Sequence, residues 1–172
     1  GTVDGHRVAV MPQRLSSAST IDSSSIENLA GDADHAEIFA FGKGGSLSGV
    51  IDGRTGGFDV LDLSAVSTNL SVTIHTDGTV SLTDGTNTLS PVAGMESIIG
   101  GSGNNRFVFE NGASFAGAID GGTGGTNTLD YSAYQTPVLV DLASGTAKVG
   151  GTIITGGEMN VLWPCGRRRP GW

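Results

Sequence analysis

Residues 49–65 read GVIDGRTGGFDVLDLSA, and residues 117–133 read GAIDGGTGGTNTLDYSA. The second segment matches the first at an offset of 68 and carries Gly and Asp at the same positions. The similarity extends outward, because residues 26–31 (IENLAG) match residues 95–100 (MESIIG) at an offset of 69. Self-similarity over such a length is typical of repeat architectures. The sequence therefore predicts two copies of one structural unit.

The two copies divide the chain into three parts. Residues 26–94 and 95–162 are the copies, and together they form one predicted β-helix domain, residues 26–162. Residues 1–25 are rich in Ser and have no counterpart, so we expect a cap or a tail there. Residues 163–172 (WPCGRRRPGW) differ sharply in composition from the rest and form an atypical C-terminal tail.

A shorter period lies inside each copy. Turns rich in Gly recur at nearly even spacing and begin near positions 31, 53, 78, 100, 121 and 145. Short apolar runs such as residues 60–63 and 138–142 lie between these turns. Alternate residues of such runs point to one side of a strand, where they stack on the coils above and below. The spacing predicts an all-β, right-handed parallel β-helix or β-roll-like solenoid of about six coils.

A second architecture remains open. Residues 73–82 read TIHTDGTVSL, and Asp77-Gly78 in this segment is a strong hairpin signal. Asp84-Gly85 offers a second tight turn close by. If both segments are hairpins, the fold is an antiparallel β-sandwich.

Composition and charge limit the partners of the chain. The 172 residues contain 29 Gly and one Cys, and the formal net charge is −8. An acidic surface argues against nucleic acid, because binding phosphates requires a basic one. No apolar run approaches the roughly 18 residues that a membrane-spanning helix needs, and we therefore expect no membrane span. A single Cys excludes a disulfide within the chain.

Four glycine turns resemble a known calcium-binding motif. Residues 100–108 (GGSGNNRFV) are similar to the nonapeptide G-G-x-G-x-D-x-U-x of the RTX repeat family. Residues 121–129 and 53–61 look like the same motif with one inserted residue, and residues 31–39 look like an eroded copy. The resemblance covers most of residues 26–160 and implies a secreted bacterial surface or adhesin protein.

The resemblance also implies a calcium ligand set. In the family, each calcium is shared between stacked turns and held by backbone carbonyls and Asp carboxylates. This chain departs from the pattern, because two of the four Asp places carry Asn and the nonapeptides are not consecutive. The alternative role for these side chains is hydrogen bonding to their own turn backbone. The candidate calcium residues are Asp32, Asp34, Glu37, Asp59, Asn105 and Asn127.

No catalytic motif is visible in the sequence. The three His residues show no metal-ligand spacing, and no Ser lies in a nucleophile-elbow frame. Asp59, Asp62 and Asp130 are the candidates for a carboxylate pair of the kind used in glycoside hydrolysis. Asp62 and Asp130 occupy equivalent places in the two copies, however, and repeated residues are more typical of architecture than of a single reaction centre.

These observations predict a non-catalytic extracellular module of adhesin or RTX type, secreted or at the cell surface. It would act as a spacer or a binding surface, with calcium stabilising its turns. The alternative is a polysaccharide-active hydrolase or lyase, or a carbohydrate-binding β-helix that uses stacked carboxylates. The expected partners are a carbohydrate or cell-surface ligand and a second copy of the chain, because open strand edges favour end-to-end association.

Overall fold

The computed structural model describes residues 7–10, 20–22, 28–42, 49–141, 145–149 and 152–155. All regular elements in these ranges are β-strands, which confirms the all-β class. The predicted tail, most of the predicted N-terminal cap and residues 156–162 lie outside the described residues.

The strands form three sheets. Sheet 1 contains, in spatial order, β12 (Ala118–Asp120), β10 (Ser97–Ile99), β6 (Val60–Asp62), β4 (Ile38–Phe41), β1 (Arg7–Val10) and β2 (Thr20–Asp22). Sheet 2 contains β13 (Thr128–Asp130), β11 (Asn105–Phe109), β7 (Leu70–Ile74), β8 (Val80–Thr83), β9 (Thr88–Ala93), β5 (Val50–Asp52) and β3 (Asn28–Ala30). Sheet 3 contains β14 (Val138–Asp141), β15 (Thr146–Val149) and β16 (Thr152–Thr155).

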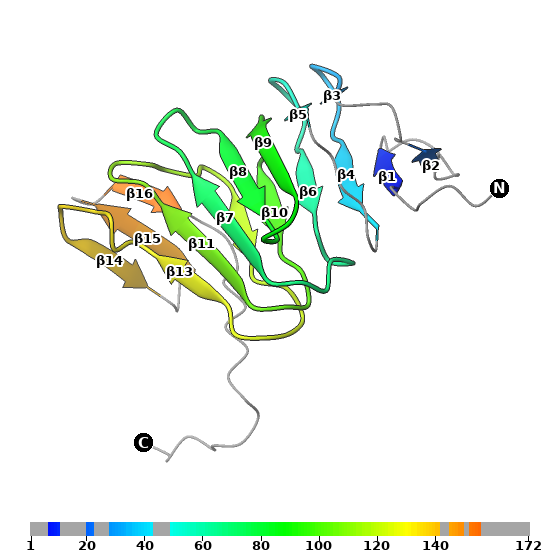
Figure 1. Ribbon diagram of the computed structural model, residues 1–172. Coiled ribbons are helices and arrows are strands. Elements are labelled where there is room, and N and C mark those ends of the chain that lie inside the picture. Colours follow the sequence, from blue (N-terminus) through cyan, green and yellow to red (C-terminus); the bar gives the residue numbers. More distant parts are fainter. Residues whose placement is uncertain are drawn as a thin grey trace, which may run out of the picture.

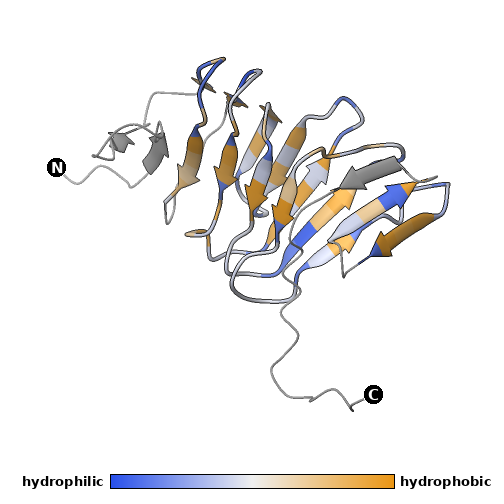
Figure 2. Cartoon of the chain, turned by 180° about the vertical axis from the view of Figure 1, so that it is seen from behind, coloured by the Kyte–Doolittle hydropathy of each residue, from blue (hydrophilic) through white to orange (hydrophobic). Residues whose placement is uncertain are grey.

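The chain passes back and forth between sheets 1 and 2. From β3 to β7 it changes sheet at every connection, and it does so again from β9 to β13. Successive strands of one sheet are therefore parallel along much of the stack, which runs from β4 to β13 (Figure 1). The hydrophobic segments lie mainly on the strands, whereas the connecting loops are mostly pale or blue (Figure 2).

The register of neighbouring strands aligns the buried side chains into columns. In sheet 1, Phe39 pairs with Leu61, Leu61 with Ile98 and Ile98 with Ile119, and all four are buried. In sheet 2, the corresponding column consists of Leu29, Ile51, Val92, Val80, Ile74 and Phe109. Polar residues such as Ser71 and Thr73 alternate with the apolar ones, so each of these strands has one face toward the core.

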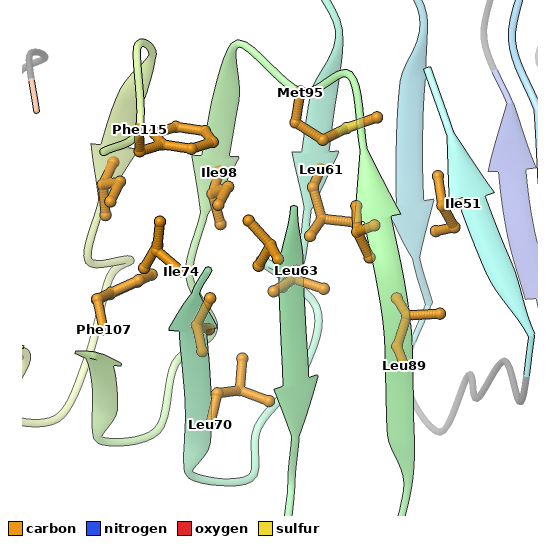
Figure 3. Close-up of a cluster of buried hydrophobic side chains, with 14 of the residues drawn as sticks. Ile51, Leu61, Leu63, Leu70, Ile74, Leu89, Met95, Ile98, Phe107 and Phe115 are labelled. Carbon is orange, nitrogen blue, oxygen red and sulfur yellow. The ribbon is translucent and has the colours of Figure 1, made fainter. Parts of the chain in front are cut away.

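The two columns belong to one hydrophobic core. Leu61 and Ile98 of sheet 1 and Ile74 of sheet 2 point into the same interior (Figure 3). Complete burial of one such side chain contributes about 1.5–3 kcal/mol. The core is therefore held together by stacking of like positions rather than by any single anchoring residue.

The prediction of a parallel solenoid of about six coils is wrong. Strand β8 runs antiparallel to both β7 and β9, β1 runs antiparallel to β4, and sheet 3 is antiparallel throughout. Sheets 1 and 2 thus have mixed strand directions and do not close into uniform coils. The layering agrees with the sandwich alternative, although many of the pairings are parallel.

Tight hairpin turns are the physical reason for this difference. Gly78 and Gly85 have φ angles of 82° and 91°, and they lie in the short connections that flank β8. A connection of this kind reverses the chain within a few residues, whereas a parallel neighbour needs a longer crossover. The spacing predicts solenoid corners near residues 78 and 145, but both turns close hairpins instead.

Segments that match in sequence form strands in the same order. At the offset of 68, β5, β6 and β7 correspond to β12, β13 and β14. Each copy then continues as an antiparallel meander, β7–β8–β9 and β14–β15–β16, but β15 and β16 begin earlier in the sequence than the offset predicts. The corresponding strands lie in different sheets, however. β6 belongs to sheet 1, while its counterpart β13 belongs to sheet 2.

Glycine allows the turns of neighbouring strands to stack directly on one another. Gly57 has a φ of 76°, and a Cβ atom there would overlap the carbonyl oxygen of His35 in the adjacent turn. Gly78 has a similar φ of 82°, but a Cβ atom there would meet nothing within 4 Å. A substitution at Gly78 therefore measures only the cost of the left-handed backbone, whereas a substitution at Gly57 measures that cost together with the loss of turn stacking.

We expect Gly57→Ala to be more destabilising than Gly78→Ala. Both substitutions place a Cβ on a left-handed backbone, which costs about 1–2 kcal/mol. Gly57→Ala also forces two stacked turns apart, which adds about 1–3 kcal/mol. Urea denaturation of both variants measures the difference in the free energy of unfolding, and equal values would show that the turn stacking contributes nothing.

Candidate functional site

Acidic side chains precede three neighbouring strands of sheet 1. Glu37 precedes β4, Asp59 precedes β6 and Glu96 lies immediately before β10. The Glu37 N–H donates to Asp59 Oδ1 over 2.7 Å, and the Asp59 N–H donates to Glu96 Oε2 over 2.8 Å. Two of these carboxylates therefore bind the backbone at the entry to a neighbouring strand, which forms an acidic ladder of Glu37, Asp59 and Glu96.

Asparagine has the same role at the entries to sheet 2. Each Asn Oδ1 accepts a hydrogen bond from a backbone N–H in the neighbouring turn. The pairs are Val50 to Asn28 at 3.1 Å, Asn104 to Asn69 at 2.9 Å, Thr126 to Asn104 at 2.6 Å and Asn105 to Asn127 at 3.1 Å. The repeated polar residues thus satisfy backbone groups between stacked turns.

The Asn105 amide is the most enclosed part of this arrangement. Its Nδ2, which carries two N–H groups, lies within hydrogen-bond distance of the carbonyl oxygens of Gly101, Gly103 and Gly121, at 3.0, 3.1 and 2.8 Å. It also lies 3.0 Å from Asn127 Oδ1. Asn105 is 1% exposed, so this amide group fills the centre of the turn and supplies its donors to carbonyls that are buried with it.

Glu37 and Asp59 occupy the equivalent places in the first copy. Both residues are buried, and Glu37 Oε2 and Asp59 Oδ2, like Asn105 Oδ1, have no hydrogen-bond partner among the described residues. Glycine keeps the surroundings open: a Cβ at Gly31 would meet Glu37 Oε2 and the Gly53 carbonyl, and a Cβ at Gly53 would meet Asp59 Oδ2 and the Gly94 carbonyl. Two unpartnered carboxylate oxygens and two backbone carbonyls therefore lie around these glycines, with the Met95 methyl group beside them.

Burial raises the pKa of Asp59 above its ordinary value, and the neighbouring Glu37 carboxyl raises it further. The hydrogen bond from the Glu37 backbone N–H acts in the opposite direction but is a smaller influence than burial. Burial and the neighbouring carboxyl thus favour the protonated form of Asp59, and a bound cation would offset the same two effects.

The six candidate calcium residues thus fall into three groups. Glu37 lies with Asp59, and Asn105 lies with Asn127. Asp32 and Asp34 lie together on an exposed turn, where Asp32 accepts from the Asp34 N–H at 3.1 Å and pairs with His35 at 3.2 Å. In the part of the chain that the structure describes, no three His, Cys, Asp or Glu side chains cluster as a metal would require.

The candidate catalytic acids do not converge. Asp59 lies in the acidic ladder, whereas Asp62 Oδ1 accepts from the Ser64 N–H at 2.9 Å. Asp130 accepts from the Ser132 N–H at 2.8 Å and pairs with Arg106. Ser132, together with Arg106, holds the pKa of Asp130 below its ordinary value. Asp62 and Asp130 therefore stabilise the turns that follow β6 and β13, by accepting hydrogen bonds from the backbone.

A separate line of three side chains was missed in the sequence. His75 Nδ1 lies 2.9 Å from Glu110 Oε1, and His75 Nε2 lies 2.8 Å from Ser81 Oγ. The Asp77-Gly78 hairpin could have indicated the first half, because it places His75 diagonally opposite Ser81. Glu110 is distant from His75 in the sequence, and only the parallel pairing of β7 with β11 brings the two together.

Comparisons with family models, with curated proteins and with solved structures give no match. Among the residues that the structure describes, no helix is long and apolar enough to cross a membrane. The geometry above is therefore the basis for the functional proposal.

Asp59→Asn tests the shared buried space. An acid whose folded-state pKa is raised stabilises the fold fully below its unfolded pKa, and this stability is lost as the pH rises through the folded pKa. We therefore expect the wild type to lose stability above about pH 4 through Asp59, with each unit of pKa shift contributing about 1.4 kcal/mol. Asn keeps the acceptor for the Glu37 N–H but cannot ionise.

The measurement is the free energy of unfolding at pH 4 and pH 7 in EDTA. Asp59→Asn is expected to flatten the loss over this interval, and Asp84→Asn serves as the control. Hydrogen bonds led by that from the Asn87 backbone lower the pKa of Asp84, so its contribution disappears below about pH 4 instead. Identical pH profiles for the wild type and Asp59→Asn would contradict the burial argument.

Proposed function

We propose that this chain is an extracellular repeat module of adhesin or RTX type, secreted or displayed at the cell surface, which serves as a spacer or a binding surface. The observation that supports this role is the use of the repeated polar residues. Asp59, Asn105 and Asn127 link stacked turns through backbone hydrogen bonds, so these side chains maintain the stack. A protein whose repeated residues hold its stacked turns together is suited to act as a spacer.

Calcium binding at Glu37 and Asp59 is part of this proposal. Calcium takes six to eight oxygen ligands and prefers carboxylates and carbonyls. The pair offers two carboxylate oxygens without partners among the described residues, and the Gly53 and Gly94 carbonyls lie close to them. When bound, the ion would supply the positive charge that this buried pair lacks. The Asn105 turn fits an ion poorly, because its amide already occupies the centre.

A polysaccharide-active enzyme finds less support in the same residues. A glycoside hydrolase needs two carboxyl groups flanking an open position. Asp59 is fully buried, and Asp62 and Asp130 are bound to the backbone that follows them. Carbohydrate or another cell-surface ligand remains the proposed partner of the module as a binding surface.

Association with a second copy of the chain also belongs to the proposal. β3 and β13 are the terminal strands of sheet 2, and each has one paired neighbour among the described strands. Leu139 and Val140 in β14 are 66% and 39% exposed, whereas Val72, which corresponds to Val140, is fully buried. Apolar strand residues exposed in this way favour self-association, which sedimentation at several concentrations measures.

Calcium is expected to raise the melting temperature of the wild type and not that of Asp59→Asn. At a calcium concentration of 100 Kd, binding to the folded state alone adds about 2.7 kcal/mol, which corresponds to roughly 5–10 °C for a chain of this size. Thermal melts in calcium and in EDTA measure the shift. Magnesium at the same concentration is the ionic control.

Asp77→Asn is the matched variant for this experiment, because Asp77 is an exposed turn residue that accepts from its own turn at Thr79. It is expected to respond to calcium as the wild type does. A wild-type melting temperature that calcium leaves unchanged would refute calcium stabilisation. An equal rise in Asp59→Asn would refute the assignment to the Glu37–Asp59 pair.

A further inference from the structure

Ser81, His75 and Glu110 form a continuous hydrogen-bonded line at the outer face of sheet 2. Ser81 Oγ lies 2.8 Å from His75 Nε2, and His75 Nδ1 lies 2.9 Å from Glu110 Oε1. Ser81 belongs to β8, His75 follows β7 directly and Glu110 follows β11 directly. One side chain thus comes from each of three adjacent strands or from the residue directly after it.

The chemistry of the groups assigns the protons in this line. An ionised Glu110 carboxylate can only accept, so His75 Nδ1 must carry the proton that joins them. Nε2 of the neutral imidazole is then an acceptor, and the Ser81 hydroxyl donates to it. A hydroxyl bound to a base, with the base oriented by an acid, is the arrangement that activates a serine nucleophile.

The backbone fixes all three residues. The His75 N–H donates to the Thr79 carbonyl at 2.9 Å, which closes the hairpin, and the Glu110 N–H donates to the Ile74 carbonyl at 3.1 Å. Ser81 pairs in regular register with Thr73 of β7. The irregularity on its other side lies in β9, where Val92 and Leu89 pair with Val80 and Leu82 and leave one extra residue opposite Ser81.

His75 and Glu110 also break the internal repeat. At the offset of 68, Ala143 takes the place of His75 and Gly42 takes the place of Glu110. The architectural acids Asp62 and Asp130, in contrast, are repeated. A line that occurs once and is not needed in the other copy is better explained by a local activity than by the requirements of the fold.

We propose that Ser81, His75 and Glu110 form a nucleophilic serine site that acts on carboxylic esters. Ser81 Oγ forms a bond to the acyl carbon while His75 Nε2 takes its proton. The ester C–O bond then breaks, and His75 gives that proton to the departing alcohol. Water attacks the acyl-serine, its proton passes through His75 to Ser81 Oγ, and the carboxylic acid leaves. Glu110 is a positioning residue that stabilises the imidazolium.

The surroundings indicate small, reactive esters as substrates. The His75 and Glu110 side chains are 30% and 44% exposed, so the site is open to solvent. Thr73 pairs directly with Ser81 across β7 and β8, which puts its hydroxyl, a hydrogen-bond donor, on the same face of sheet 2 as Ser81. An open site with few such donors suits the hydrolysis of activated esters, whereas amides demand stronger stabilisation of the oxyanion.

Covalent labelling tests the nucleophile directly. The full chain is incubated with a fluorophosphonate, and peptide mass spectrometry locates the adduct. The expected result is an adduct on Ser81 that is absent from His75→Gln and unchanged in Ser71→Ala. Ser71 is the control because it lies in β7 on the same face of sheet 2 as Ser81. Labelling of Ser81 no faster than of Ser71 would overturn the proposal.

Hydrolysis of p-nitrophenyl acetate tests turnover. Ser81→Ala is expected to lower the rate by on the order of 100-fold, and it retains every His that could react on its own. Glu110→Gln is expected to lower kcat while leaving KM unchanged, which a loss of folding would not do, and circular dichroism checks the fold of each variant. A Ser81→Ala rate equal to that of the wild type would refute the site. Neither assay depends on calcium or on Asp59.

Discussion

Direct stacking of turn backbones is the constraint on which the rest of the structure depends. Gly57 lies against His35, and Gly125 lies against Gly103, at separations that leave no room for a side chain. Because the turns lie this close, neighbouring strands stay in register and their buried residues form continuous columns. The same closeness lets one side chain at a strand entry reach the backbone of the next turn. The high glycine content, the core and the polar ladders are therefore three results of one geometric requirement.

The local features of this fold could be predicted from the sequence, while the direction of several strands could not. Alternating runs such as residues 70–74 and the glycine turns between them identify an all-β chain. The turns near residues 78 and 145 have nearly the same spacing as the others, yet each reverses the chain. Spacing measures only how often the chain turns. The reversal depends on the length of each turn and on long-range pairing, and the Asp77-Gly78 signal competed with the period of the whole unit.

In the candidate site, too, the residue positions could be predicted from the local sequence, but their partners could not, because these depend on distant strands. Glu37, Asp59, Asn105 and Asn127 occupy equivalent places in the sequence, but they fall into two pairs at the entries to different sheets. The chain order alone could not show this, because it depends on the three strands β7, β8 and β9 remaining in one sheet. The Ser81 line lay beyond prediction for a similar reason, since Glu110 reaches His75 only through the pairing of distant strands.

The meander of three strands in sheet 2 has a consequence for longer chains of this kind. It gives the first sequence copy an odd number of crossings between sheets 1 and 2, so β6 and its counterpart β13 lie in different sheets. In an extended array whose units were all built like the first copy, odd-numbered and even-numbered units would present the same residues in opposite directions. A ligand approaching from one flank would then meet every second unit, and a multivalent partner would need a linker that spans two units to gain avidity.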